Sequence, residues 1–291
     1  MHTVLLFYKY VTIADPQALV EWVRERAEHY KLRGRCLVAQ EGINGTFEGL
    51  EQDAEAFAAE LLAREPFTDM NIKRSRGTGN SFPKLAVRQR NEIVGTRFSK
   101  EDADPEHKTA PHMPPEELKA LYEQDADFVV IDMRNDYEFS SGHFKNSINP
   151  VLSAARDLPQ ALSKLEPYKN KKVITVCTGG VRCEKMAAYL MSHGFSDVSQ
   201  LENGIHAYME KYPGEDFLGT LYTFDQRVVM DFGGPRQIIG KCHHCNTPTE
   251  QYVNCANYVC HLHFLVCDAC KSTEGRTYCS EHCKITDKIT A

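Results

Sequence analysis

Cysteine is concentrated at the C-terminal end of this chain of 291 residues, where eight of its 11 cysteines lie within the last 50 positions. They form four close pairs, Cys242-x2-Cys245, Cys255-x4-Cys260, Cys267-x2-Cys270 and Cys279-x3-Cys283. Eight thiols at this spacing match two tetrahedral zinc sites of four cysteines each. The segment has few apolar residues with which to build a core, so bound metal would supply its stability. The pairs therefore predict a zinc-binding module over residues 216–291.

The sequence leaves the ligand sets of this module open. Joining the first pair to the third and the second to the fourth would give a cross-braced module. The histidines that could replace a thiol are His243, His244, His261, His263 and His282. An iron–sulfur cluster and eight metal-free cysteines are the alternatives. We favour zinc because crowded cysteines in a reducing compartment indicate metal ligation rather than disulfides.

Residues 1–98 have the pattern of a small α+β domain. The expected elements are a strand over 2–11, a helix opened by Asp15-Pro16, a hairpin over 33–49, a helix over 49–66, and strands over 70–76 and 84–94. Proline is favoured at the first position of a helix, and we expect Asn44-Gly45 to form the hairpin turn. The order β-α-β-β-α-β predicts a ferredoxin-like or acylphosphatase-like sheet.

A second α/β domain is expected over residues 116–215, after a charged, proline-rich linker at 99–115. Its expected elements are a helix over 116–124, strands over 127–134 and 171–177, a helix over 184–194, and a strand over 197–204. Strands that alternate with helices predict a parallel sheet. The whole chain is thus a multi-domain α/β protein with a C-terminal metal module.

Charge and hydropathy restrict the classes of partner. The formal net charge is −6, which excludes a wholly basic nucleic-acid-binding protein and requires a local patch for any RNA contact. The sequence has no run of about 18 apolar residues such as a membrane span needs. The apolar N-terminus lacks a basic leader and a small-residue cleavage site, so it reads as a strand. We expect a cytoplasmic protein with no membrane partner.

A buried apolar run, VITVC, ends on Cys177 and is followed at once by a glycine turn. The loop consists of Thr178, Gly179, Gly180, Val181 and Arg182, with Cys183 directly after it. Functional groups gather at the carboxyl ends of parallel strands, where Cys177 would lie. The glycines let several N–H groups point at one spot, and the N-terminus of the following helix adds positive potential. This pattern predicts a reactive thiolate at Cys177; a buried strand cysteine before a turn is the alternative interpretation.

The length of the loop indicates the chemistry. Four residues separate Cys177 from Arg182, whereas the phosphate-binding loop of protein tyrosine phosphatases has five between its cysteine and arginine. A cradle that is one residue shorter suits a sulfur atom better than a phosphate.

These residues resemble the rhodanese family. The segment IDMRNDYEFSSGHFKNSINP carries the family's spacing at Asp132, Arg134, Glu138, Gly142 and His143. QLENGIHAY resembles the closing segment, with LENG where many members have two glycines. The resemblance implies a persulfide on Cys177, and Asp132 and Arg134 as organisers of the loop. Cys183 is either a resolving thiol or a residue that merely starts the helix.

The whole chain resembles a narrower family, the bacterial rhodanese-like tRNA uridine hydroxylases. EGINGT in the N-terminal unit, CTGGVRCEK in the centre and the cysteine-rich tail carry this resemblance. It implies tRNA as substrate, molecular oxygen as co-substrate, and 5-hydroxylation of wobble uridine-34. In the corresponding hypothesis, Cys177 adds to C6 of the uridine and enriches C5, which then reacts with oxygen. A reductant or a sulfur-carrier protein is a further expected partner.

Two other functions remain open at this point. One is a sulfurtransferase that passes persulfide sulfur from Cys177 to an acceptor. The other is a zinc-stabilised RNA- or protein-binding module without activity, against which the intact CTGGVR loop weighs. The sequence has no arrangement of two histidines and a carboxylate for iron, and no dinucleotide fingerprint after a strand.

A basic stretch over residues 72–98 is the candidate RNA contact. Its cations are Lys73, Arg74, Arg76, Lys84, Arg88, Arg90 and Arg97. Glu92 is the single acid among them, so the local charge is +6. Phe82 and Phe98 lie among the charges, and such a mixture suits phosphate contact and base stacking. A solvated strand face is the alternative, and EGINGT is expected to be a turn without a catalytic role.

Overall fold

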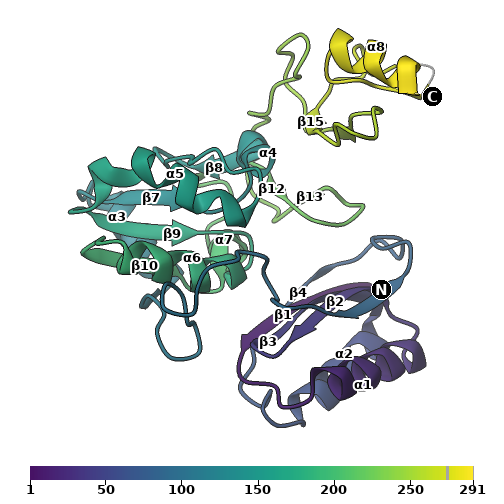
Figure 1. The fold of residues 1–291 in the computed structure, drawn as a ribbon, viewed down its shortest axis with the longest axis vertical. Helices are drawn as coiled ribbons and strands as arrows, with labels where there is room; N and C mark the ends of the chain where they lie inside the picture. Colours follow the sequence, from purple (N-terminus) through teal and green to yellow (C-terminus); the bar gives the residue numbers. More distant parts are fainter. Residues whose placement is uncertain (273–274, 291) are drawn as a thin grey trace.

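The structure, a computed structural model, describes residues 1–272 and 275–290. Three units follow one another along the chain (Figure 1). An N-terminal sheet with two helices on one face lies below a central sheet flanked by helices, and a small C-terminal module lies on the far side of the central unit. None of the helices in the described part of the chain has the length and apolar character needed to cross a bilayer.

The N-terminal unit confirms the expected β-α-β-β-α-β order. Its elements are β1 His2–Tyr10, α1 Pro16–His29, β2 Arg33–Ala39, β3 Gly42–Leu50, α2 Glu51–Leu62, β4 Ile72–Arg76 and β5 Leu85–Gln89. The strand order is β4-β1-β3-β2-β5, and β5, which corresponds to the strand expected over 84–94, runs parallel to β2 at the edge of the sheet. Phe7, Phe47 and Phe57 pack ring against ring between the sheet and its helices. Both helices of this unit, α1 and α2, lie on one face of the sheet, so in the described chain its opposite face is bare of N-terminal helices (Figure 1).

The expected hairpin turn at Asn44-Gly45 is wrong. The strands β2 and β3 pair from Ala39 with Gly42, so the chain turns at 40–41 and Asn44-Gly45 lies within β3. A Cβ on Gly45 would come within 2.4 Å of the Phe7 ring, so this glycine allows close packing in the sheet rather than a turn.

The central unit confirms the expected parallel sheet. Its elements are β6 His112–Met113, α3 Pro115–Glu123, β7 Val129–Asp132, α4 Asp136–Ser141, β8 Gly142–Phe144, η1 Ala155–Asp157, α5 Leu158–Leu165, η2 Glu166–Tyr168, β9 Lys172–Val176, α6 Val181–Ser192, β10 Asp197–Leu201 and α7 Gly204–Lys211. The sheet order is β6-β10-β9-β7, with all strands parallel. The short edge strand β6 belongs to the segment 99–115 that was expected to be a linker.

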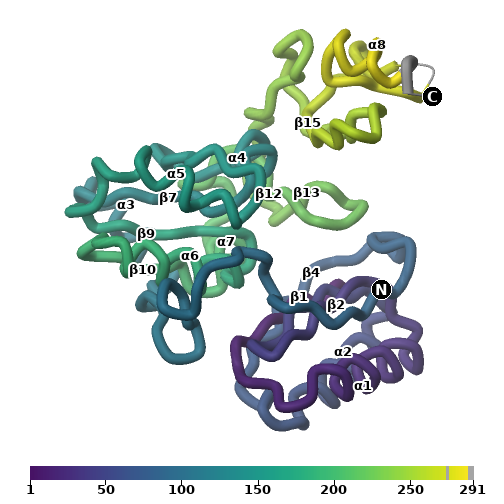
Figure 2. The backbone as a smooth tube through the Cα atoms, in the orientation of Figure 1, coloured from purple at the N-terminus to yellow at the C-terminus, as the bar shows by residue number. Residues whose placement is uncertain are grey.

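The chain beyond residue 215 first completes the central core. Its elements are β11 Phe217–Gly219, β12 Leu221–Tyr222, β13 Val229–Met230, β14 Tyr252–Asn254, β15 His263–Leu265 and α8 Glu281–Thr290. β11 pairs with β8, and Phe217 packs on Phe144 with ring centroids 5.4 Å apart. The hairpin of β12 and β13 then reaches toward the N-terminal sheet (Figure 2), where Gln226 N–H donates to the Ser81 carbonyl. The expected boundaries at 98, 115 and 215 stay predictions.

Candidate active site

The thiol of Cys177 lies directly after the central strand β9, as the sequence predicted. The loop curls so that the Gly180 N–H donates to Cys177 Sγ at 3.2 Å. Gly180 has φ of 101°, and a Cβ there would lie 2.6 Å from the Tyr8 hydroxyl. Glycine is therefore required both by the backbone turn and by the N-terminal sheet that packs on it. α6 begins at Val181, so its N-terminus faces the thiol.

The charge state of Cys177 differs from that of its neighbour Cys183. Burial raises the pKa of Cys177, but the Cys183 thiol, the Arg182 guanidinium and the amides of these two residues outweigh burial and lower that pKa to about 6. Burial and the adjacent Cys177 raise the pKa of Cys183 well above its ordinary value. The loop therefore favours the thiolate form at Cys177 and the protonated thiol at Cys183.

Arg182 is held in place by Glu138, a fully buried residue of α4. Two guanidinium nitrogens of Arg182 donate to the two Glu138 oxygens at 2.6 and 2.9 Å. The Thr178 hydroxyl also donates to Glu138, at 3.4 Å, and the Asn135 N–H caps it at 3.0 Å. Paired bonds of this kind fix the orientation of an arginine. Glu138 therefore positions the loop, a role that the sequence analysis did not assign to it.

Asp132 and Arg134 form a second buried ion pair, and Arg134 acts electrostatically on Glu138. Arg134 Nη2 donates to Asp132 at 2.6 Å and to the Gly142 carbonyl at 2.5 Å. Burial raises the pKa of Glu138, but Arg182 and then Arg134 hold it below its ordinary value. The pair acts electrostatically on Glu138 and also directly on Arg182 of the thiol loop, and its organising role stays a prediction.

A cavity of about 570 Å³ opens between the loop, the bare face of the N-terminal sheet and the hairpin of β12 and β13. Its cationic lining residues are Arg35, Lys73, Arg156, Arg182 and Arg227. Asp225 is the single carboxylate among the lining residues, and it is paired with Arg227 at 2.6 Å. The side chain of Cys177 lines the floor but has no exposed surface, so a reactant reaches the sulfur only when a neighbouring side chain moves. The cavity combines positive charge with apolar walls.

The two domains that build the cavity are joined by direct bonds. The Tyr8 hydroxyl donates to Glu184 at 3.1 Å, and the Tyr10 hydroxyl donates to the Val181 carbonyl at 3.2 Å. Lys185 Nζ, which is buried, lies 2.7 Å from Glu41 and 2.9 Å from Glu92. Removing one partner from a buried ionic group of this kind typically costs about 3–5 kcal/mol, so these bonds hold the bare sheet face against the loop.

The basic stretch is divided by the fold. Lys73 and Phe82 line the cavity, whereas Arg74 pairs with Glu55 of α2 at 2.7 Å. The other cations of the stretch are exposed; they are Arg76, Lys84, Arg88, Arg90 and Arg97. Phe98 stacks on Tyr189 with ring centroids 4.3 Å apart, which withdraws it from base stacking. RNA contact by Lys73, Arg74, Arg76, Lys84, Arg88 and Arg90 stays a prediction.

Sequence reasoning missed part of the cavity wall. Asn44 and Thr46 of EGINGT line it, and His206 of the closing segment lines it from α7. Asn44 also donates from its amide nitrogen to the Ile93 carbonyl at 3.1 Å. The available signal was the period-two alternation of β3, which places Asn44 and Thr46 on one face.

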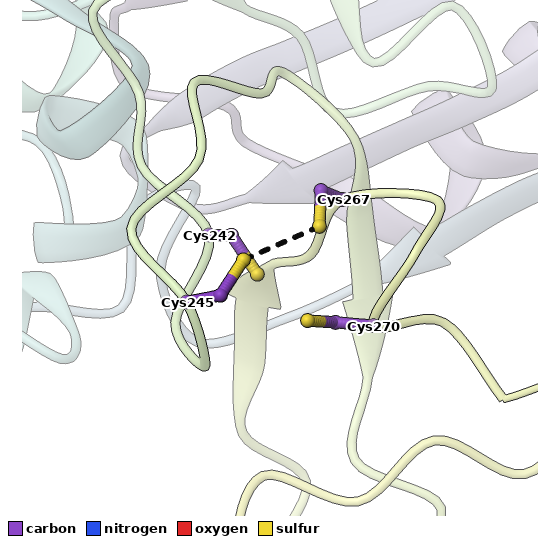
Figure 3. A group of neighbouring side chains, drawn as sticks. All are labelled: Cys242, Cys245, Cys267 and Cys270. Carbon is purple, nitrogen blue, oxygen red and sulfur yellow. Dashed lines mark hydrogen bonds between the residues drawn. The ribbon is translucent and has the colours of Figure 1, made fainter.

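The cysteine-rich module contains two groups of four thiols. Cys242, Cys245, Cys267 and Cys270 form one group, and Cys255, Cys260, Cys279 and Cys283 form the other. Within each group the sulfur atoms lie within 4.8 Å of one another. Figure 3 shows the first group, in which the sulfurs of Cys245 and Cys267 are 3.5 Å apart. The first pair thus joins the third and the second joins the fourth, which is the cross-braced arrangement.

The spacing of the thiols fits a tetrahedral metal site. Zinc–sulfur bonds of about 2.3 Å place two ligands of a tetrahedron about 3.8 Å apart. The sulfurs of Cys260 and Cys279 are 3.7 Å apart and those of Cys279 and Cys283 3.5 Å apart, far beyond the about 2.05 Å of a disulfide. Neither group includes a histidine from the described residues. Both groups can therefore hold a metal ion.

Family models match the chain in three segments. Residues 2–93 match the UPF0176 acylphosphatase like domain, residues 114–211 the Rhodanese-like domain, and residues 218–284 the Rhodanase C-terminal model. Each of the three matched segments corresponds to one of the three units of the structure (Figure 1).

Similar proteins cover nearly the whole chain. One from Staphylococcus carnosus (strain TM300), named tRNA uridine(34) hydroxylase, is 39% identical over 297 residues, covering 97% of this chain and 93% of its own length. Another of the same name, from Staphylococcus aureus (strain Newman), is 40% identical over 286 residues, covering 97% and 89%. A crystal structure of a rhodanese-like domain protein from Staphylococcus aureus is 28% identical over 34% of this chain and 90% of that one, with a TM-score of 0.29.

Proposed function

This chain belongs to the tRNA uridine(34) hydroxylase family, and from that premise we propose that it hydroxylates C5 of the wobble uridine of tRNA with Cys177 as the nucleophile. The observation that carries the proposal is the position of a thiolate at the floor of a cationic cavity built by two domains. A wobble uridine lies in a single-stranded loop and can turn out of its stack at little cost. The exposed cations Arg76, Arg88 and Arg90 lie on the same domain as the cavity wall and suit the flanking phosphates.

The chemistry begins with attack of Cys177 Sγ on C6 of the ring. The C5=C6 electron pair moves toward C5 and the C4 carbonyl, which makes C5 electron-rich. Molecular oxygen then reacts at C5, and an external reductant supplies two electrons and two protons so that one oxygen atom remains on C5 and the other leaves as water. Loss of the C5 proton and of the thiolate restores the ring and frees Cys177.

The proposed metal is zinc, with a structural role. The residues that line the cavity end at Met230, before the first cysteine of the module. The module instead supports α4, because the Tyr252 hydroxyl donates to the Tyr137 carbonyl at 2.5 Å beside Glu138. We place the enzyme in the cytoplasm, where tRNA is found and where free thiols persist.

The test uses cells that lack the native protein and are complemented with wild type, Cys177→Ser or Cys36→Ala. Their tRNA nucleosides are compared by mass spectrometry. Cys36 is a matched control, since it is a buried thiol in the core of the N-terminal sheet. We expect wild type and Cys36→Ala to restore the extra oxygen on uridine-34 and Cys177→Ser to lack it. Normal hydroxylation with Cys177→Ser would refute the proposal. A sulfur atom on the uridine in place of the oxygen, present only when Cys177 is intact, would identify the protein as a sulfurtransferase. The amide that donates to Cys177 Sγ would also stabilise a persulfide there.

A further inference from the structure

Lys73 is a buried cation for which the described residues supply no hydrogen-bond partner. It lies on β4, on the bare face of the N-terminal sheet, with 6% of its surface exposed. Among the described residues, no hydrogen-bond partner reaches its Nζ, which lies 5.2 Å from the centre of the Tyr8 ring. Burying an unpaired charge lowers the stability of the folded protein, so a function at the cavity would account for a lysine at this position.

Lys73 interacts electrostatically with the Cys177 thiolate and faces the cavity. Titratable and charged groups face it from β1, from the thiol loop and α6, from the turn after β10, from α7 and across the cavity; they are Tyr8, Cys177, Arg182, Glu184, Glu202, His206, Glu210, Arg35, Asp225 and Arg227. The thiolate of Cys177 is the strongest of the negative influences on Lys73. Glu184 is already occupied by Tyr8, His112 and Gln200, at 2.9–3.1 Å. Glu210 lies 3.4 Å from His206.

We propose that Lys73 is the acid that donates a proton to O4 of the uracil ring while Cys177 attacks C6. The inference rests on the proposed function and assigns a catalytic role to a residue of the N-terminal domain. The cavity that holds the ring is lined by Lys73 on the sheet side and by Cys177 on the loop side. A ring between them presents C6 to the sulfur and its carbonyl edge to the ammonium.

The proposed step balances without a redox partner. The bond between Cys177 Sγ and C6 forms, and the C5=C6 pair moves to make C5=C4 while the C4=O4 pair moves onto O4. A proton passes from Lys73 Nζ to O4, so a thiolate, a neutral ring and an ammonium become a neutral enol adduct and a neutral amine. Without the proton, the step would place an enolate anion in a partly apolar cavity.

The acidity of Lys73 suits this transfer. Burial lowers its pKa to about 8, although Cys177 and the nearby carboxylates oppose the shift. The thiolate is present above about pH 6 and the ammonium below about pH 8. An acid whose pKa lies near the working pH is the most effective donor, and such catalysis contributes about 10²–10⁴-fold to rate.

The test isolates the addition step with tRNA that carries 5-fluorouridine at position 34. Fluorine at C5 withdraws electrons and makes C6 more electrophilic, so the Cys177 adduct should accumulate and appear as a denaturation-stable protein–tRNA band. Single-turnover rates are measured without oxygen at saturating enzyme, from pH 5 to 10. The variants are Lys73→Met, Lys73→Arg and the control Lys100→Met, whose lysine side chain is 80% exposed.

We expect a bell-shaped profile for wild type and for Lys100→Met, with limbs near pH 6 and 8. Lys73→Met should lower the adduct rate at pH 7 by about 100-fold or more and lose the alkaline limb. Lys73→Arg should keep part of the rate and also lose that limb, because a guanidinium stays charged. The affinity for tRNA should change less than about threefold.

Two results overturn the assignment of Lys73 while leaving the proposed function intact. One is an unchanged adduct rate in Lys73→Met. The other is weaker tRNA binding with a salt slope reduced by about 0.9 and an unchanged rate once bound, which would make Lys73 a phosphate contact. Failure of wild type itself to form a Cys177-dependent adduct would instead refute the nucleophile, and the role of Lys73 with it.

Discussion

Replacing Lys73 by methionine should stabilise the protein, because the native ammonium is buried and has no hydrogen-bond partner in the described part of the chain. Methionine has a similar length and no charge, so it can occupy the same space. The same exchange should abolish most of the activity if Lys73 is the proton donor. A gain in stability together with a loss of activity is typical of a residue that is kept for function.

The size of the gain follows from the pKa of Lys73. Burial lowers it from 10.5 to about 8, and each pKa unit corresponds to about 1.36 kcal/mol. Below pH 8 the lysine is charged in the folded and unfolded states, so the full cost of about 3 kcal/mol is present. Between pH 8 and 10.5 Lys73 is deprotonated in the folded protein but still protonated in the unfolded chain. The free-energy cost of burying its charge therefore falls to about 1 kcal/mol at pH 10. The lost contact with the Tyr8 ring offsets about 1 kcal/mol, which leaves a net gain of about 2 kcal/mol at pH 6.5.

The assay is urea denaturation followed by tryptophan fluorescence at constant zinc. The chain has one tryptophan, Trp22, which packs against the core of the domain that contains Lys73. Unfolding is measured at pH 6.5 and pH 10 for wild type, Lys73→Met and Lys100→Met. The exposed control should stay within about 0.5 kcal/mol of wild type.

Two outcomes would refute the reasoning. A Lys73→Met protein no more stable than wild type at pH 6.5 would mean that the ammonium has a partner or is well hydrated. A gain of equal size at pH 10 would show that the effect comes from packing and not from the buried charge.

The remaining predictions concern the thiolate and the metal. Arg182→Met should raise the pKa of Cys177 from about 6 toward the 8.5 of a free thiol, which lowers its alkylation rate at pH 7 by up to about 30-fold; an unchanged rate would show that the loop amides suffice. Elemental analysis should find two zinc ions per chain and one after Cys267→Ser, because that residue belongs to one of the two thiol groups; iron with labile sulfide would contradict the choice of metal. Chelation should unfold the module and leave the Trp22 transition unshifted.

Features that depend on short spacing could be predicted from the sequence. The pairs of the C-terminal module indicated two four-thiol sites, since a metal needs a set number of ligands at short range. Cys177 could be placed at the end of a strand and before a helix, because an apolar run, two glycines and a helical pattern determine the local backbone. The order of strands and helices could likewise be predicted from hydrophobic periodicity.

Features that depend on the docking of distant segments were decided by the tertiary structure. Alternation along β4 places Lys73 and Arg74 on opposite faces, but it does not show that one face would line the cavity and that the other would meet Glu55. Asn44-Gly45 has the composition of a turn, yet β3 continues through it because Gly45 admits the Phe7 ring. Local preference is worth about 1 kcal/mol or less per residue, and packing across a sheet or a domain junction outweighs it. The loop that carries Cys177 could thus be located in the sequence, whereas the cavity and the lysine that lines it form only once the N-terminal sheet has packed on the loop.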